Sequence, residues 1–96
     1  MRTGAEVELL VAGWDAHARV SRRFGGGAYA EALERCSREL RARGEGERRA
    51  EILGALAGGW KGEVERRRER DREDSYAAGL EGCAEELLGE GCWAER

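Results

Sequence analysis

Apolar residues return every three or four positions in four separate stretches of the chain. This spacing is that of one face of an α-helix, so it predicts four amphipathic helices. The expected helices span residues 4–23, 28–43, 47–58 and 62–89. Their apolar stripes consist of Val7, Leu10, Val11, Trp14 and Ala18; Tyr29, Leu33, Cys36 and Leu40; Leu53, Leu56, Ala57, Trp60 and Val64; and Tyr76, Leu80, Cys83 and Leu87.

Glycines mark the expected ends of the first three helices. The three consecutive residues Gly25–Gly27 end the first one, since each glycine costs a helix on the order of 1 kcal/mol. Residues 44–46 (GEG) end the second, and Gly58 and Gly59 should bend or stop the third. Residues 65–75 contain no apolar side chain, but opposite charges recur four residues apart. This stretch is predicted to be a solvated helix that leads into the fourth apolar stripe.

Two stretches of the chain resemble each other closely. Residues 29–40 (YAEALERCSREL) and 76–87 (YAAGLEGCAEEL) are identical at seven of twelve positions, and they contain both tyrosines of the chain. A tryptophan precedes each copy, at Trp14 and Trp60. We interpret the pattern as a duplicated helical hairpin of about 46 residues. The alternative is chance similarity between two amphipathic helices of the same biased composition.

The composition also favours an all-α fold. The chain has 96 residues and no proline, and because β-branched residues are scarce, no segment favours a sheet. We predict a single helical domain over 1–96 in a four-helix arrangement, with hairpin A at about 4–43 and hairpin B at about 47–90. Leu, Ile, Val and Phe together number fifteen, so the core is small. A small core suggests help from a protein partner or from a second copy of the chain.

Cysteine and histidine are the first candidates for metal or redox chemistry. Cys36 and Cys83 occupy matching repeat positions, so pseudo-twofold packing would bring them together. With the single histidine, His17, they form a candidate metal set. The alternative is that both cysteines fill the core as small apolar side chains, and we expect no cofactor. The wide spacing of the three cysteines favours reduced thiols and a cytoplasmic location.

Charged residues make up 39% of the chain, and their balance argues against nucleic acid as a partner. Arg19, Arg22 and Arg23 form one basic cluster, and a second lies within residues 66–72. Acidic residues are interleaved with the second cluster, and the net charge is −3. A self-paired surface is therefore favoured over one that binds phosphates.

Two short motifs resemble known families. The run GAYAEALERCSREL, residues 27–40, is similar to the second helix of a tetratricopeptide repeat. In the preceding helix, Val20 and Arg23 fill positions where that family has a small and an aromatic residue, and the spacing near 46 exceeds the family's 34. The tripeptide at residues 60–62 (WKG) resembles the Trp-x-Gly turn of small secreted helical-hairpin proteins, which implies a turn there. Neither resemblance assigns a functional residue.

The sequence contains no arrangement of residues typical of an enzyme, since one histidine without a motif supports no nucleophilic or acid–base site. We therefore expect a non-enzymatic protein–protein interaction module, a small helical adaptor or inhibitor, that binds another protein or a second copy of itself. The expected binding residues are Arg19, Arg22, Arg23 and Trp93. The alternatives are a ligand- or metal-binding bundle and a nucleic-acid-binding regulator. No membrane partner is expected, because glutamates interrupt the apolar run near the N-terminus.

Overall fold

The computed structural model describes residues 4–43 and 49–89, and this part of the chain contains four α-helices and no β-strand. The predicted all-α, four-helix fold is confirmed. The first two helices begin and end within a residue of their predicted bounds, whereas the third and fourth do not. The helices are α1 (Gly4–Arg23), α2 (Gly27–Arg43), α3 (Arg49–Arg70) and α4 (Ser75–Leu88).

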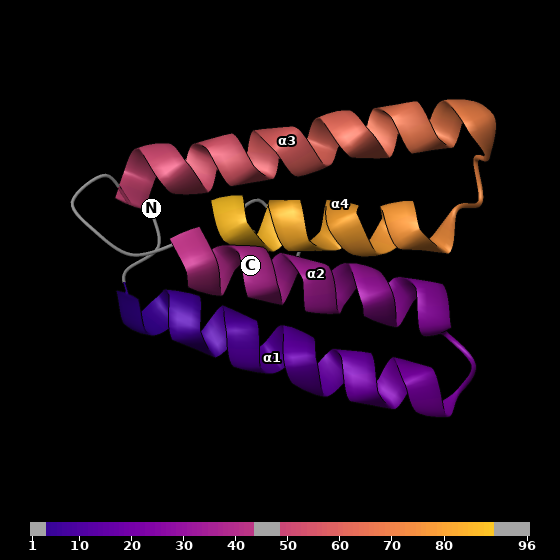
Figure 1. Ribbon diagram of the computed structural model, residues 1–96, viewed down its shortest axis with the longest axis horizontal. Helices are drawn as coiled ribbons and strands as arrows, with labels where there is room; N and C mark the ends of the chain where they lie inside the picture. Colours follow the sequence, from indigo (N-terminus) through magenta and orange to yellow (C-terminus); the bar gives the residue numbers. More distant parts are fainter. Residues whose placement is uncertain (1–3, 44–48, 90–96) are drawn as a thin grey trace.

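Each helix runs antiparallel to the one before it, and α2 and α4 lie at the centre of the molecule (Figure 1). α1 packs along α2 and α3 packs along α4, which gives the two predicted hairpins. The hairpins meet mainly through α2 and α4, which run in the same direction. The outer helices α1 and α3 therefore each keep one face away from the other hairpin.

The third helix does not stop at Gly58 and Gly59, as the sequence predicted, but continues to Arg70. Leu53 and Trp60 lie on its inner face and are buried, and burial of one large apolar side chain contributes about 1.5–3 kcal/mol. The glycines lie on the outer face, where each costs about 1 kcal/mol relative to alanine. Tertiary packing therefore outweighs the low helix propensity of this segment. The turn implied by the WKG motif is absent for the same reason.

The expected helix over 62–89 is interrupted, because the chain turns between α3 and α4. Two aspartates build this turn. Asp71 Oδ1 accepts a hydrogen bond from the Glu73 N–H at 3.0 Å, and Asp74 Oδ1 accepts one from the Ala77 N–H at 3.0 Å. Asp74 is thus the N-cap of α4, and it satisfies an amide that has no partner within the helix.

The turn between α1 and α2 uses glycine instead. Gly25 has a φ of 85°, a conformation that side chains with a Cβ rarely adopt. The Gly26 N–H donates to the Ser21 carbonyl at 2.7 Å, and the Gly25 N–H donates to the Arg22 carbonyl at 3.2 Å. This pair of bonds is a Schellman motif, which ends α1 by satisfying two of its last carbonyls.

The core lies along the inner faces of all four helices. Trp14 and Trp60 are each only 2% exposed, and their rings meet edge to face with centroids 6.0 Å apart. Tyr29 and Tyr76, also predicted for the core, are half-buried against it. The remaining buried apolar residues are Val7, Val11, Ala18, Ala30, Ala32, Leu33, Cys36, Leu40, Leu53, Leu56, Ala57, Val64, Ala77, Leu80, Cys83, Ala84 and Leu87.

Candidate functional site

Equivalent residues of the two hairpins meet where α2 contacts α4. Ala32 and Gly79 occupy matching positions of the repeat, and a Cβ placed on Gly79 would lie 2.7 Å from the Ala32 Cβ. Only glycine therefore fits at position 79 without a shift of the helices. Cys36 and Cys83, the next matching pair along the helices, form a side-chain hydrogen bond with each other. The two helices are thus related by a pseudo-twofold axis that runs along them and passes between the two residues of each pair.

The tryptophan contacts obey the same symmetry. Trp14 Nε1 donates to Glu86 Oε1 at 3.1 Å, and Trp60 Nε1 donates to Glu39 Oε1 at 2.7 Å. Each tryptophan comes from one hairpin and each carboxylate from the other. Because buried indole N–H groups require an acceptor, these two bonds fix how the hairpins sit on one another. This reciprocal arrangement supports the duplication inferred from the sequence.

The two central thiols are poorly suited to redox or metal chemistry as they stand. Cys36 and Cys83 are both fully buried and both reduced. The hydrogen bond with Cys36, together with burial, raises the pKa of the Cys83 thiol far above its ordinary value. The thiolate is the form that attacks disulfides and binds metals. The geometry therefore favours the core-filling interpretation of this pair.

His17 does not join the two cysteines. It lies exposed on α1, where its ring packs against the Tyr29 ring at a centroid distance of 5.2 Å. Across residues 4–43 and 49–89, no group of three or more His, Cys, Asp or Glu side chains is arranged to hold a metal ion. The structure thus keeps His17 apart from the two cysteines of the candidate metal set.

The predicted basic binding cluster is only partly available. Arg22 forms a double hydrogen bond with Glu34 of α2, in which Nε lies 3.2 Å from Oε2. The matching residue of hairpin B, Arg68, pairs with the equivalent Glu81 through one bond, from Nη1 to Oε2 at 2.9 Å. Arg19 and Arg23 are exposed at the end of α1. The fourth predicted binding residue, Trp93, lies outside the described residues, as do residues 44–46.

Two arginines of the second basic cluster, Arg67 and Arg68, take part in internal contacts. Arg67 lies 4.0 Å from Glu63, as the four-residue spacing predicted, and its Nε donates to Asp74 Oδ2 at 3.1 Å. The same guanidinium stacks over the Tyr76 ring, 4.2 Å from its centroid. These contacts fasten the end of α3 to the start of α4. The expected self-pairing is thus seen for Arg67.

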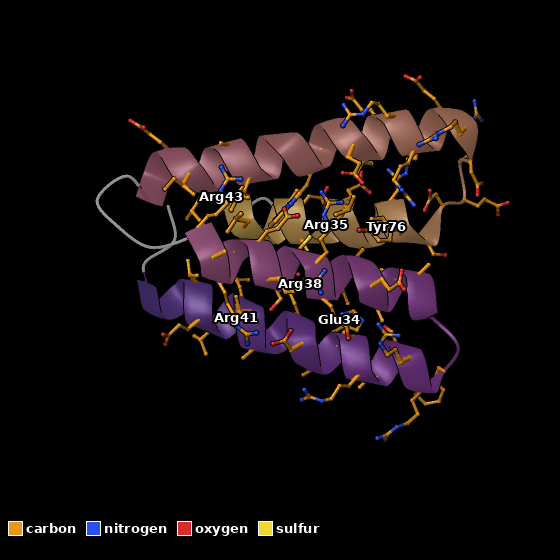
Figure 2. All side chains as sticks on the ribbon, viewed as in Figure 1. Glu34, Arg35, Arg38, Arg41, Arg43 and Tyr76 are labelled. Carbon is orange, nitrogen blue, oxygen red and sulfur yellow. The ribbon has the colours of Figure 1, made fainter. Side chains whose placement is uncertain are left out.

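Arg35 binds three groups at the junction of α2, α3 and α4. It donates to Glu39 at 2.7 Å, to Glu63 at 2.9 Å and to the Tyr76 hydroxyl at 3.3 Å. Figure 2 shows Arg35 reaching from α2 toward Tyr76, whereas Glu34 and Arg41 of the same helix point toward α1. The bond to Glu63 is the main cause of the raised pKa of Arg35, and burial opposes it. A cation held by two carboxylates stabilises the junction and leaves little capacity for a ligand.

An open groove of about 1000 Å³ lies between α3 and α4. Acidic and basic residues line it, and Val64 is the one apolar residue among them. A ligand pocket is usually mostly apolar, with a few converging polar groups, and this groove lacks that composition. It is lined by Lys61, Val64, Glu65, Arg68, Glu69, Arg70, Arg72, Glu81 and Glu85.

The outer face of α1 is apolar although it faces water. Leu9 is 73% exposed, Val20 is 51% exposed and Phe24, which directly follows the helix, is 82% exposed. They are the exposed large apolar residues of the part of the chain that the structure describes. Smaller residues fill the gaps between them on the same face. We call this surface the outer α1 face, and it consists of Leu9, Ala12, Gly13, Ala16, Val20 and Phe24.

The sequence also contains a signal for this face, beside the stripe that predicted the core of α1. Leu9, Gly13, Ala16, Val20 and Phe24 follow one another at spacings of three or four residues. This is a second apolar stripe on the helix that already carries Val7, Val11 and Trp14. A helix with two apolar stripes buries one in its own core and offers the other to a partner.

Comparisons with protein-family models, with curated proteins and with solved structures found no match for this chain. Within the described residues, no helix is both long and apolar enough to cross a membrane.

Proposed function

We propose that this protein is a non-enzymatic protein–protein interaction module that binds a partner protein through the outer α1 face. The observation that carries the proposal is the exposure of Leu9 and Val20 on the outer side of α1 and of Phe24 directly after this helix. Exposed apolar patches of this kind mark interaction sites on otherwise polar proteins. An amphipathic helix of the partner fits such a ridge best, because its own apolar face would cover the stripe along its length.

Arg19 and Arg23 border the proposed binding face and would contact the polar rim of an interface. Rim charges influence the rate and the specificity of association more than the affinity. Arg19 and Arg23 would thus favour a partner whose surface is acidic beside the contact. Arg22 has a smaller role, since it already pairs with Glu34.

The remaining contacts support an adaptor more than an enzyme or a ligand carrier. The indole N–H groups, the Arg35 guanidinium and the Arg67 guanidinium are bound to groups of the chain itself. The buried reduced thiols Cys36 and Cys83 are compatible with the proposed cytoplasmic location, where disulfides are rare.

The test is the native mass of the protein as it occurs in its source. We expect the chain to migrate well above its own 10.6 kDa. The substitution Leu9→Glu should return it to that mass, whereas Ala55→Glu, at the matching exposed position of α3, should not. A wild-type chain found only at 10.6 kDa would contradict the proposal.

A further inference from the structure

The partner of the outer α1 face is, we infer, the same face of a second copy, packed antiparallel about a twofold axis that passes near Ala16. This inference rests on the proposed function and names its partner. Within the described residues, the large exposed apolar side chains all belong to this one face. A second copy therefore covers all of them at once, which is the property of an isologous interface.

The order of large and small residues along the face fits this pairing. Antiparallel packing about a point just after Ala16 places Leu9 opposite the second copy's Phe24. It also places Val20 opposite Gly13, so a large residue meets a small one, and Ala16 meets its own copy. The small residues at the centre allow the helix axes to approach closely. Leu9 and Phe24 thus pack against each other at both ends of the contact, and Val20 fills the space over Gly13.

The charges beside the face select the antiparallel orientation. Glu8 lies near the start of α1, and Arg19 and Arg23 lie near its end, all three exposed. On a helix they fall on one flank of the apolar stripe. Antiparallel packing brings Glu8 close to the second copy's Arg23, whereas parallel packing would place the two charged flanks on opposite sides of the contact, where they could not pair. Opposed helix dipoles favour the same orientation.

The matching face of α3 is not a better partner. The residues equivalent to Leu9, Val20 and Phe24, counted from the paired tryptophans, are Ala55, Arg66 and Arg70. Pairing of α1 with α3 of another copy would cover Leu9 with an arginine side chain. It would also leave a free α1 face at one end of every assembly and produce open chains. The self-paired dimer covers the apolar residues and keeps both arginines in water.

The size of the contact sets the expected affinity. α1 has 20 residues and is about 30 Å long, so one helix pair falls below the roughly 1,200 Å² of a standard interface. We therefore expect a dissociation constant on the order of micromolar. The dimer should form and dissociate reversibly over an accessible range of concentrations.

Sedimentation equilibrium of the purified chain tests the inference. The wild type should shift with concentration from 10.6 kDa to twice that mass and no further. Leu9→Glu should weaken the association about 30-fold or more, because it buries an unpaired carboxylate opposite Phe24. The matched control Ala55→Glu should behave as the wild type. A monomer at every concentration, equal effects of the two variants, or growth beyond the dimer would each overturn the inference.

A cross-linking experiment tests the axis itself. Ala16→Cys, combined with Cys92→Ser, should form a disulfide-linked dimer under mild oxidation, since both copies of residue 16 lie at the axis. Gly62→Cys in the same background is the control, and it should remain uncross-linked. Cross-linking at residue 62 but not at residue 16 would contradict the pairing. A purified chain that stays monomeric while Leu9→Glu still lowers the native mass in the source would reject the self-pairing and retain the proposed function.

Discussion

The two hairpins have the same inner faces and different outer faces. Trp14 and Trp60 are equally buried and donate to equivalent glutamates across the axis. On the outside, large apolar residues of α1 stand where α3 has alanine and arginine. Packing constrains the inner positions, because a change there opens a cavity or causes a clash. The outer positions are free to differ, so the difference between the hairpins points to function.

The turns show that one geometry can be reached by two chemistries. Gly25 ends α1 through backbone freedom, and Asp74 begins α4 through a side-chain hydrogen bond. Both connect helices that pack side by side. The glycines at residues 25–27 and the charged residues 71–74 therefore differ in turn chemistry at equivalent places of the two hairpins.

The sharpest test of the symmetry is removal of the tryptophans. Trp14→Ala and Trp60→Ala should each lower the free energy of unfolding by about 3–5 kcal/mol, because each leaves a cavity and an acceptor without its donor. Urea unfolding, monitored by circular dichroism, measures the loss in each variant. The double substitution should cost less than the sum, since the rings contact each other. Clearly unequal single values would show that the hairpins are not energetically equivalent.

The next largest effect on stability is expected where α2 contacts α4. Gly79→Ala should destabilise the fold by about 1–3 kcal/mol, because the new methyl group would clash with Ala32. Gly82→Ala, on the same helix with open space around it, should stabilise by roughly 0.5–1 kcal/mol. Adding Ala32→Gly to Gly79→Ala should recover part of the loss in thermal unfolding. No recovery would argue against the reciprocal fit of this pair.

The dependence of stability on pH should report on the Glu39 carboxylate, which accepts a hydrogen bond from Trp60. Burial would raise the pKa of Glu39, but hydrogen bonds from Arg35 and Trp60 outweigh burial and lower it. A lowered pKa in the folded state stabilises the protein above the ordinary value of 4.5, and this stabilisation is lost as the pH falls through the folded-state pKa. The urea concentration at the unfolding midpoint, measured from neutral pH to pH 3, should therefore fall less steeply with acid in Glu39→Gln than in the wild type. An unchanged slope below pH 4.5 would refute this assignment.

The smallest effect is expected at the paired surface arginines. Arg22→Ala and Arg68→Ala each remove one exposed ion pair that the symmetry repeats. Exposed pairs contribute little, and salt screens them. Both variants should unfold close to the wild type in urea, and high salt should remove any difference between them. A large loss in only one of them would indicate a further contact on that side.

The sequence by itself determined the class of fold, most of the core and the repeat. These features depend on local period and on residue type, as in the stripes of Leu33, Leu40, Leu80 and Leu87. It did not determine where α3 ends, because Gly58 and Gly59 are weak helix formers that only the burial of Leu53 and Trp60 overrides. Helix propensity is local, and the burial that outweighs it is not.

Some features of the candidate site were likewise predicted from the sequence, and others depended on tertiary contacts. The sequence placed Cys36 and Cys83 at matching positions, and tertiary packing showed that they meet as buried thiols. Arg22 looked available in the sequence but is paired with Glu34 in the fold. α1 carries two apolar stripes, and only the packing against α2 decided that Trp14 turns inward and Leu9 faces water. Periodicity identifies apolar faces, whereas contact between helices decides which of them is left for a partner.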